Sequence, residues 1–273
     1  MIKIHREGFS VRIYEDSQPH HYKSAGIQKG LILVYNSQEV SGEGIGFGAP
    51  VVKYTDKTYF SQEALLFMPN TDNITGFTKR YKVNSVFRAK FLGRHIKSSS
   101  LYKFTNYISK IHRDHAKART IIDPILAIIR KSMGRPADLV FASDKGEIAV
   151  TYRIYDNLIN ITVDTSELDK NNCVEICIMN EQGADFFRKY SDSDGLIFIG
   201  NKIPSWQKVL AERARFSDID EKMSFELMKL PNADLYLGRE LFKGHLAWTG
   251  FAYCIPPSID SFGYNIKIGN RMS

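Results

Sequence analysis

The glycine-rich stretch at residues 40–54 carries a carboxylate that could take part in proton transfer. Glu43 lies between Gly42 and Gly44, and two more glycines follow at 46 and 48. Every second residue of an extended chain faces the same side, so this spacing predicts a strand with one side of bare backbone. We expect aromatic rings, another main chain or a ligand against that side. Glu43 is a candidate catalytic residue that could transfer a proton or accept bonds from sugar hydroxyls, and an exposed strand charge is the alternative.

A second candidate site lies near the end of the chain, in the segment HLAWTGFAY at 245–253. His245 is a candidate catalytic residue that could move protons, and Trp248 and Tyr253 are candidate ligand-binding residues whose rings could stack on a sugar. Trp248 and Tyr253 differ in parity along a strand, so they share a face only across a bulge, which Gly250 permits. Core aromatic residues give the same pattern.

Basic and aromatic residues alternate at 74–95, which predicts a hairpin with a turn near Asn84. Its aromatic face would include Tyr81, a candidate ligand-binding residue. The other face would carry Arg80, Lys82, Arg88 and Lys90. Arg80 and Arg88 could hold an anionic group through paired hydrogen bonds, as guanidinium groups do well. The alternative is a solvated sheet face on which lysines protect an edge.

Known cofactor and metal patterns do not account for these residues. The segment GIGFGA at 44–49 matches a dinucleotide-binding pattern, but Pro50 and two valines follow, where that motif requires the start of a helix. The three cysteines, Cys173, Cys177 and Cys254, are too few for a disulfide framework, and no second Cys/His pair has zinc-finger spacing. We therefore expect no cofactor and no metal.

Composition limits the class of protein without selecting a partner. The chain has 273 residues, 43% of them hydrophobic, and a formal net charge of +7. This excess of basic residues favours binding to anionic partners. The alternative is that it only keeps the protein soluble. The N-terminus lacks the apolar run of a signal peptide, and no stretch approaches the ~20 apolar residues that span a bilayer. We therefore expect a cytoplasmic protein with no membrane partner.

The spacing of apolar residues predicts many strands and two helical segments in a single β-rich domain, residues 1–273. Alternating residues at 9–13 and an apolar run at 31–35 indicate strands, and 148–163 reads as a hairpin that turns at Asp156 and Asn157. Apolar residues three and four apart predict a helical insertion around 105–133 and a short helix around 204–216.

The predicted fold class is mainly β, a large antiparallel β-sandwich. In size and strand count alone it resembles the supersandwich of sugar mutarotases and polysaccharide lyases, although no motif residue of those families is matched. This resemblance implies a carbohydrate-binding or carbohydrate-processing protein that holds a sugar or anionic saccharide in a concave sheet cleft. The alternative is a non-enzymatic nucleic-acid-binding protein that uses the basic hairpin and a basic helix at 110–119. Oligomeric state and catalysis itself stay open.

Overall fold

The structure is a computed structural model of the chain. It describes residues 1–6, 9–18, 26–35, 38–40, 42–68, 76–88, 90–91, 94–95, 138–242 and 245–270. The predicted helical insertion around 105–133, with its basic segment, lies outside these residues. Within them, no helix is long and apolar enough to cross a membrane.

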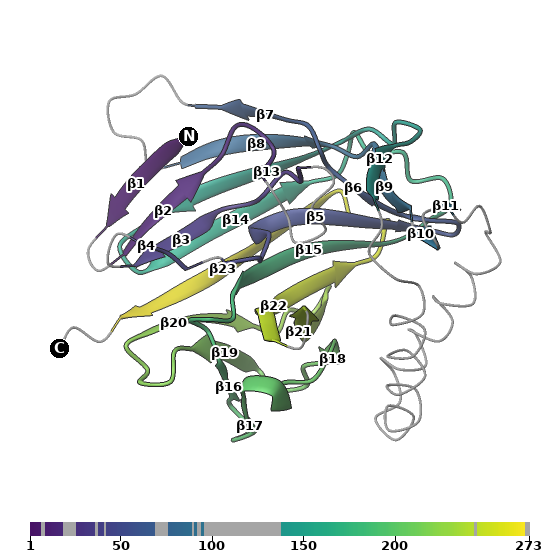
Figure 1. The fold of residues 1–273 in the computed structure, drawn as a ribbon. Coiled ribbons are helices and arrows are strands. Elements are labelled where there is room, and N and C mark those ends of the chain that lie inside the picture. Colours follow the sequence, from purple (N-terminus) through teal and green to yellow (C-terminus); the bar gives the residue numbers. More distant parts are fainter. Residues whose placement is uncertain are drawn as a thin grey trace.

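Two large antiparallel sheets form the body of the protein (Figure 1). The eight-stranded sheet has the order β12 (Asp138–Phe141), β9 (Ser85–Arg88), β6 (Thr58–Phe60), β5 (Gly46–Tyr54), β15 (Cys173–Gly183), β22 (His245–Ile255), β21 (Asp234–Phe242), β18 (Gln207–Lys208). The nine-stranded sheet has the order β17 (Ile197–Ile199), β16 (Lys189–Asp192), β19 (Arg213–Ser217), β20 (Met223–Met228), β23 (Ser261–Asn270), β14 (Leu158–Asp164), β13 (Glu147–Ile154), β8 (Gly76–Lys82), β7 (Ala64–Phe67).

Smaller elements complete the described chain. A four-stranded sheet holds β1 (Ile2–Arg6), β2 (Phe9–Ile13), β3 (Ile32–Tyr35) and β4 (Gln38–Glu39), and β10 (Lys90–Phe91) pairs with β11 (Arg94–His95). A 3-10 turn, η1, covers Gly200–Lys202. Figure 1 shows the C-terminal strand β23 in yellow beside the teal β14, with which it pairs in antiparallel register.

The main core lies between the two large sheets, as alternating apolar residues require. The eight-stranded sheet contributes residues such as Phe47, Ile178 and Phe251, and the nine-stranded sheet contributes Tyr152 and Phe225. Rings from both sheets meet edge to face, with Phe47 and Phe225 centroids 5.2 Å apart. A mainly β, sandwich-like architecture is therefore confirmed.

Several predicted strands are also confirmed. Residues 9–13 form β2, and residues 31–34 are almost fully buried, as the continuous apolar run predicts. The hairpin of β13 and β14 closes where Tyr155 N donates to Leu158 O at 2.8 Å, which places Asp156 and Asn157 at the turn. Local patterning predicts these elements because each strand pairs with its neighbour in sequence.

The glycine-rich stretch differs from the regular strand that its spacing predicts. Strand β5 begins only at Gly46, and the register with β15 shifts between Met179 and Asn180, so that Gly48 lies in a β-bulge. Gly48 has a φ of +78°, and a Cβ there would lie 2.6 Å from the Tyr152 hydroxyl. The bulge resets the alternation and turns Phe47 into the core. The bare backbone is therefore covered by an interior ring at Gly48 and by the main chain of Leu31 at Gly46, two of the three expected coverings.

The basic hairpin at 74–95 does not form. Strand β8 pairs with β7 and β13 in the nine-stranded sheet, whereas β9 pairs with β6 and β12 in the eight-stranded sheet. The chain crosses from one sheet to the other at Val83 and Asn84, so Arg80 and Arg88 lie on strands of different sheets. The alternating pattern correctly predicts both strands but says nothing about their partners.

The short helix predicted around 204–216 is wrong. The segment contains β18 and the start of β19, and burial alternates between neighbours: Val209 is 2% exposed and Leu210 is 72% exposed. Val209 N donates to Leu235 O at 2.8 Å, so pairing with the sheet determines the conformation here. The spacing of Trp206, Val209, Leu210 and Arg213 fits a helix only by coincidence.

The bulge can be tested by adding one methyl group. Gly48→Ala places a Cβ against Tyr152, whereas Gly195→Ala is a matched control because Gly195 has a φ of +86° and no atom within 4 Å of its would-be Cβ. The left-handed backbone alone costs an alanine about 1–2 kcal/mol. We expect chemical unfolding to show that loss for Gly195→Ala and a clearly larger one for Gly48→Ala. Equal losses would contradict close packing of Tyr152 on this backbone.

Candidate functional site

The outer face of the eight-stranded sheet, turned away from the core, carries a second group of buried residues. It comprises Ile27, Ile45, Ala49, Val51, Leu139, Cys177, Met179, Tyr236, Ala252 and Cys254, with Phe60 and Trp206 packed against them. Most of these residues come from alternate positions of β5, β15, β21 and β22, opposite to those that face the core, and Leu139 comes from β12. Charged residues inside this apolar surface therefore require a structural or functional reason.

Glu181 is the most deeply buried carboxylate on this face. It lies on β15, is 3% exposed, and its Oε2 accepts a hydrogen bond from Ile45 N at 3.2 Å. Burial raises the pKa of Glu181 to about 8; the Ile45 amide and the Lys29 ammonium oppose the rise, and the charge of Glu240 adds to it. A carboxyl group with this pKa exchanges a proton near neutral pH, which an ordinary glutamate does not do.

Lys29 brings a buried amine close to Glu181. It is 7% exposed, and its Nζ donates to Gly42 O at 3.5 Å. Burial lowers the pKa of Lys29, while the charges of Glu39, Glu181 and Glu43 act in the opposite direction. Glu43, the glycine-flanked carboxylate of the sequence, therefore belongs to the same electrostatic cluster as Glu181.

Two side chains from the nine-stranded sheet hold the Lys29 backbone in place. Lys79 Nζ donates to Lys29 O at 2.9 Å and to Tyr14 O at 2.8 Å, and the Tyr81 hydroxyl donates to Lys29 O at 3.3 Å. Lys79 is fully buried, and burial lowers its pKa to about 7. Tyr81, predicted to bind ligand, lies in the core and acts on the site only through this main-chain contact.

Two glycines lie beside Glu181 on the neighbouring strands, and an aromatic pair packs next to them. Across the sheet, Glu181 faces Gly250 on β22, and Gly250 faces Gly238 on β21. The Trp206 ring covers Gly238, where a Cβ would lie 2.7 Å from it, and its centroid is 5.5 Å from that of Trp248. Trp206 also has a φ of 53°, a conformation that costs energy in any residue except glycine. Packing on Gly238 stabilises it.

Of the remaining predicted residues whose side chains are described, Trp248 borders this cluster and Tyr253 does not. Tyr253 is 1% exposed in the core, and its hydroxyl donates to Met228 O. Trp248 is on the outer face, 5% exposed, next to Trp206. For His245 on β22 and Arg88 on β9 the structure describes the backbone, which places both in the eight-stranded sheet.

Arg80 lies on the outside of the opposite sheet. It borders an open hollow of about 510 Å³ with Leu65, Phe67, Thr78 and Glu147. Its guanidinium contacts Glu167 at 3.1 Å and Glu147 at 3.8 Å, and it stacks over the Phe67 ring. Arg80 therefore does not converge with Glu43 and Trp248, and its charge is already matched by two carboxylates.

Sequence reasoning missed Glu181, Lys29 and Trp206. The available signal for Glu181 was the polar run Asn180, Glu181 and Gln182, which follows the apolar residues 176–179 of β15 and is buried throughout. Lys29 and Trp206 carry no such signal, because their places depend on the bulged β5 and on the bare Gly238.

The buried carboxyl of Glu181 makes stability depend on pH. Its pKa rises from 4.5 in the unfolded chain to about 8 in the fold, so folding favours the protonated form. The protonated Glu181 therefore contributes to the free energy of unfolding. This contribution is complete below pH 4.5 and is lost as pH rises through about 8. Glu181→Gln imitates the protonated carboxyl. We expect the variant to gain stability relative to the wild type by a few kcal/mol over this window, since one pKa unit is worth about 1.4 kcal/mol.

Denaturant unfolding across the pH series measures this difference directly. Glu212→Gln, which changes an exposed carboxylate, is the control. Its plot of stability against pH should be parallel to that of the wild type. Parallel curves for Glu181→Gln as well would show that the carboxyl titrates as in the unfolded chain.

The comparisons with known proteins reveal a fold and no sequence family. No family model and no curated sequence matches the chain. The α-N-acetylgalactosaminidase NagBb of Bifidobacterium bifidum, solved with GalNAc, superposes with a TM-score of 0.53 at 10% identity over 100% of this chain. The chain spans 36% of NagBb.

Two structures of similar length match more loosely. A galactose mutarotase-like protein from Lactobacillus casei has a TM-score of 0.44 at 9% identity, covering 98% of this chain and 99% of that one. A candidate aldose 1-epimerase from Escherichia coli K12 has a TM-score of 0.42 at 6% identity, with 98% of both chains covered. The chain therefore shares its fold with part of NagBb, and the activity of this chain must be inferred from its own residues.

Proposed function

We propose that the protein binds a saccharide on the outer face of the eight-stranded sheet, with Glu181 as the group that donates or accepts a proton. The observation that carries this proposal is the buried carboxyl of Glu181, whose pKa is raised to about 8 beside two glycines and a tryptophan pair. A general acid or base works best when its pKa is near the working pH. The GalNAc bound to NagBb, which shares the fold, also supports a sugar ligand.

The local charge favours a neutral sugar over an anionic one. The charge of Glu240 acts on Glu181, the charges of Glu43 and Glu39 act on the neighbouring Lys29, and Lys29 is the cation that acts on Glu181. An anionic saccharide would meet like charges here, whereas the hydroxyls of a neutral sugar can donate to carboxylates. The proposal therefore narrows the expected ligand to a neutral saccharide.

Trp206 is the side chain that a ligand would contact first. It is partly exposed, whereas Glu181 is 3% exposed and Trp248 5% exposed. Rotation of the Trp206 ring away from Gly238 would uncover backbone next to Gly250 and Glu181. The ring face could then stack on the apolar face of a pyranose, as aromatic rings in ligand pockets do.

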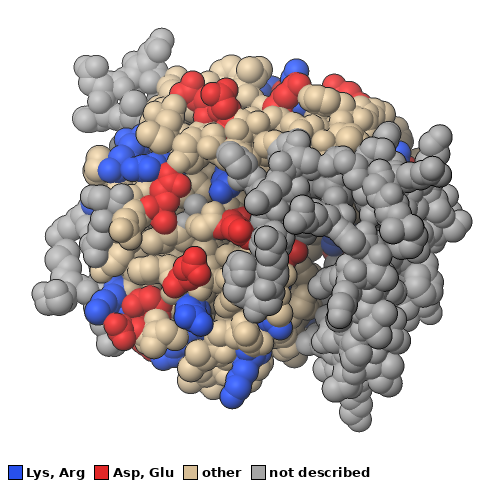
Figure 2. All heavy atoms as spheres, viewed as in Figure 1, with Lys and Arg blue, Asp and Glu red and all other residues tan. Residues whose placement is uncertain are grey.

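The described surface does not favour the nucleic-acid alternative. Arg80 and Lys82 are partly exposed and paired with Glu167 and Glu63, and the hairpin that would join them to Arg88 is absent. On the face shown in Figure 2, blue and red side chains are interspersed among the described residues. A phosphate backbone needs a continuous basic surface.

A titration with neutral sugars tests binding and proton transfer separately. We expect calorimetry to show binding of a neutral hexose or amino sugar, weakened by Trp206→Ala and unchanged by Tyr155→Ala, which removes an exposed ring at a distant turn. NMR exchange between sugar anomers should show catalysis that Glu181→Gln lowers by about 10²–10⁴-fold, the usual contribution of one acid–base group.

Each outcome has a defined meaning. If no neutral sugar binds to the wild-type protein, the saccharide proposal is wrong. If sugars bind but Glu181→Gln leaves anomer exchange unchanged, the protein binds sugars and Glu181 has no part in proton transfer.

A further inference from the structure

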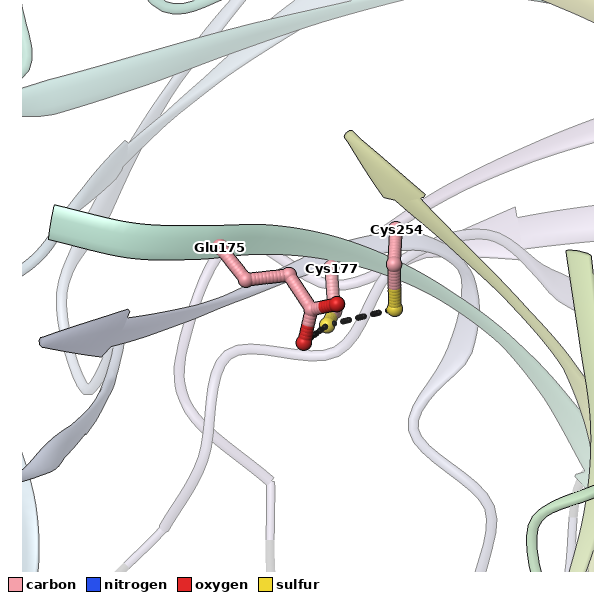
Figure 3. A group of neighbouring side chains, drawn as sticks. All are labelled: Glu175, Cys177 and Cys254. Carbon is pink, nitrogen blue, oxygen red and sulfur yellow. Dashed lines mark hydrogen bonds between the residues drawn. The ribbon is translucent and has the colours of Figure 1, made fainter. Parts of the chain in front are cut away.

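Three side chains with metal-ligand chemistry meet on the same outer face, away from Glu181 (Figure 3). Cys177 on β15 faces Cys254 on β22 in register, and their Sγ atoms are 2.8 Å apart. Glu175, two residues before Cys177, places its Oε2 3.6 Å from Cys177 Sγ. The ligand atoms of all three residues lie within 4.8 Å of one another, and both thiols are buried.

The cluster gathers groups that become negative when they lose a proton. The hydrogen bond with Cys177, burial, and the charges of Cys177 and Glu175 raise the pKa of the Cys254 thiol well above its usual range. Without a cation the Cys254 thiol stays protonated, because burial and nearby negative charge both oppose a thiolate there. A bound cation inverts this preference, since a coordinating thiol loses its proton outright.

Lys53 supports the carboxylate from the neighbouring strand. Its Nζ is 2.6 Å from Glu175 Oε2, and β5 and β15 pair at these two residues. Although burial opposes its charge, the negative charge that Cys177, Cys254 and Glu175 can carry raises the pKa of Lys53. A charged partner that orients a ligating carboxylate is a regular feature around bound metals.

We infer that Cys177, Cys254 and Glu175 bind a thiophilic divalent cation of the Zn²⁺ type. In a tetrahedral zinc site with Zn–S bonds of about 2.3 Å and Zn–O bonds of about 2.0 Å, sulfur and oxygen ligands lie about 3.5 Å apart. The Cys177–Glu175 distance of 3.6 Å already fits. Two thiolates on one zinc lie about 3.8 Å apart, so a small side-chain rotation must widen the 2.8 Å between the sulfurs.

The ligand set selects the class of metal. Thiolates favour Zn²⁺ and related soft cations over Mg²⁺ or Ca²⁺, which require oxygen ligands. Sequence reasoning expects no metal because no second Cys/His pair has zinc-finger spacing. Cys177 and Cys254 are 77 residues apart, and only strand pairing brings them together. The third cysteine, Cys173, lies near the start of β15, outside the cluster.

The metal would join the two strands that carry the proposed saccharide site without entering it. Cys177 is four residues from Glu181 along β15, and Cys254 is four residues from Gly250 along β22, or roughly 13 Å in each strand. A cation held by both cysteines cross-links β15 and β22, so its expected role is structural. Loss of the metal site would therefore leave the saccharide proposal intact.

The test uses the full chain, reduced and freed of metal by a chelator. We expect calorimetry to show about one Zn²⁺ per chain with release of about two protons, because both thiols must ionise. Co²⁺ in place of zinc should give the intense thiolate charge-transfer absorption. Cys177→Ser and Cys254→Ser should each abolish it, and Glu175→Gln should weaken zinc binding at least about tenfold, since loss of an outer-shell partner alone typically costs that much.

Two controls keep the outcome decisive. Cys173→Ser and Glu181→Gln should bind Zn²⁺ like the wild type, and Zn²⁺ should raise the unfolding temperature of both. The inference is overturned if reduced wild-type protein binds no Zn²⁺, if its Co²⁺ complex lacks thiolate absorption, or if Cys173→Ser loses binding as the cluster variants do. The first two measurements need only the wild-type protein, so they hold even if a variant fails to fold.

Discussion

The β-bulge at Gly48 is the constraint on which the candidate site depends. At this position the Tyr152 ring of one sheet packs against the bare backbone of the other, and the Tyr152 hydroxyl donates to Phe47 O at 3.0 Å. Asn180 Oδ1 accepts bonds from Gly48 N at 3.3 Å and from Tyr264 at 2.8 Å. Backbone and side chains of both sheets therefore hold one conformation of β5. Because the bulge shifts the register, Glu181 pairs with Gly46 and receives the Ile45 amide.

Burial of charge on the outer face follows from this arrangement. Lys29 lies beside the first residues of β5, where Gly30 N donates to Ile45 O at 2.7 Å, and Lys79 and Tyr81 hold its carbonyl from the opposite sheet. A lysine and a glutamate inside an apolar face destabilise the fold unless their charges are compensated. Perturbed pKa values of this kind are typical of functional sites, although structural ion pairs produce them as well. The neighbouring bare glycines and the strained Trp206 favour the functional interpretation.

Local pairing explains which predictions are confirmed. The hairpin of β13 and β14 is formed by one continuous segment of the chain. The alternation of apolar and polar residues, together with the turn residues, is therefore enough to predict it. The segment at 74–95 has the same kind of pattern, yet its two strands join different sheets, because β8 pairs with β7 and β13, and β9 pairs with β6 and β12, so partners outside the segment decide the outcome. The helix predicted around 204–216 is wrong for the same reason. Two of the predicted site residues, Glu43 and Trp248, do lie on or beside the outer face near Glu181, but Tyr81 and Tyr253 fill the core and Arg80 lies on the other sheet.

The sequence by itself determined that this protein is mainly β, where most of its strands lie, and that the glycine-rich stretch must be closely covered. These properties depend on residues a few positions apart, whose side-chain periodicity and backbone freedom act locally. Only the tertiary structure decided that Tyr152 supplies the cover, that Glu181 is buried beside Gly250, and that Cys177 meets Cys254. Each of these depends on the register between strands that are far apart in the chain, and a shift of one residue would turn every side chain concerned to the opposite face.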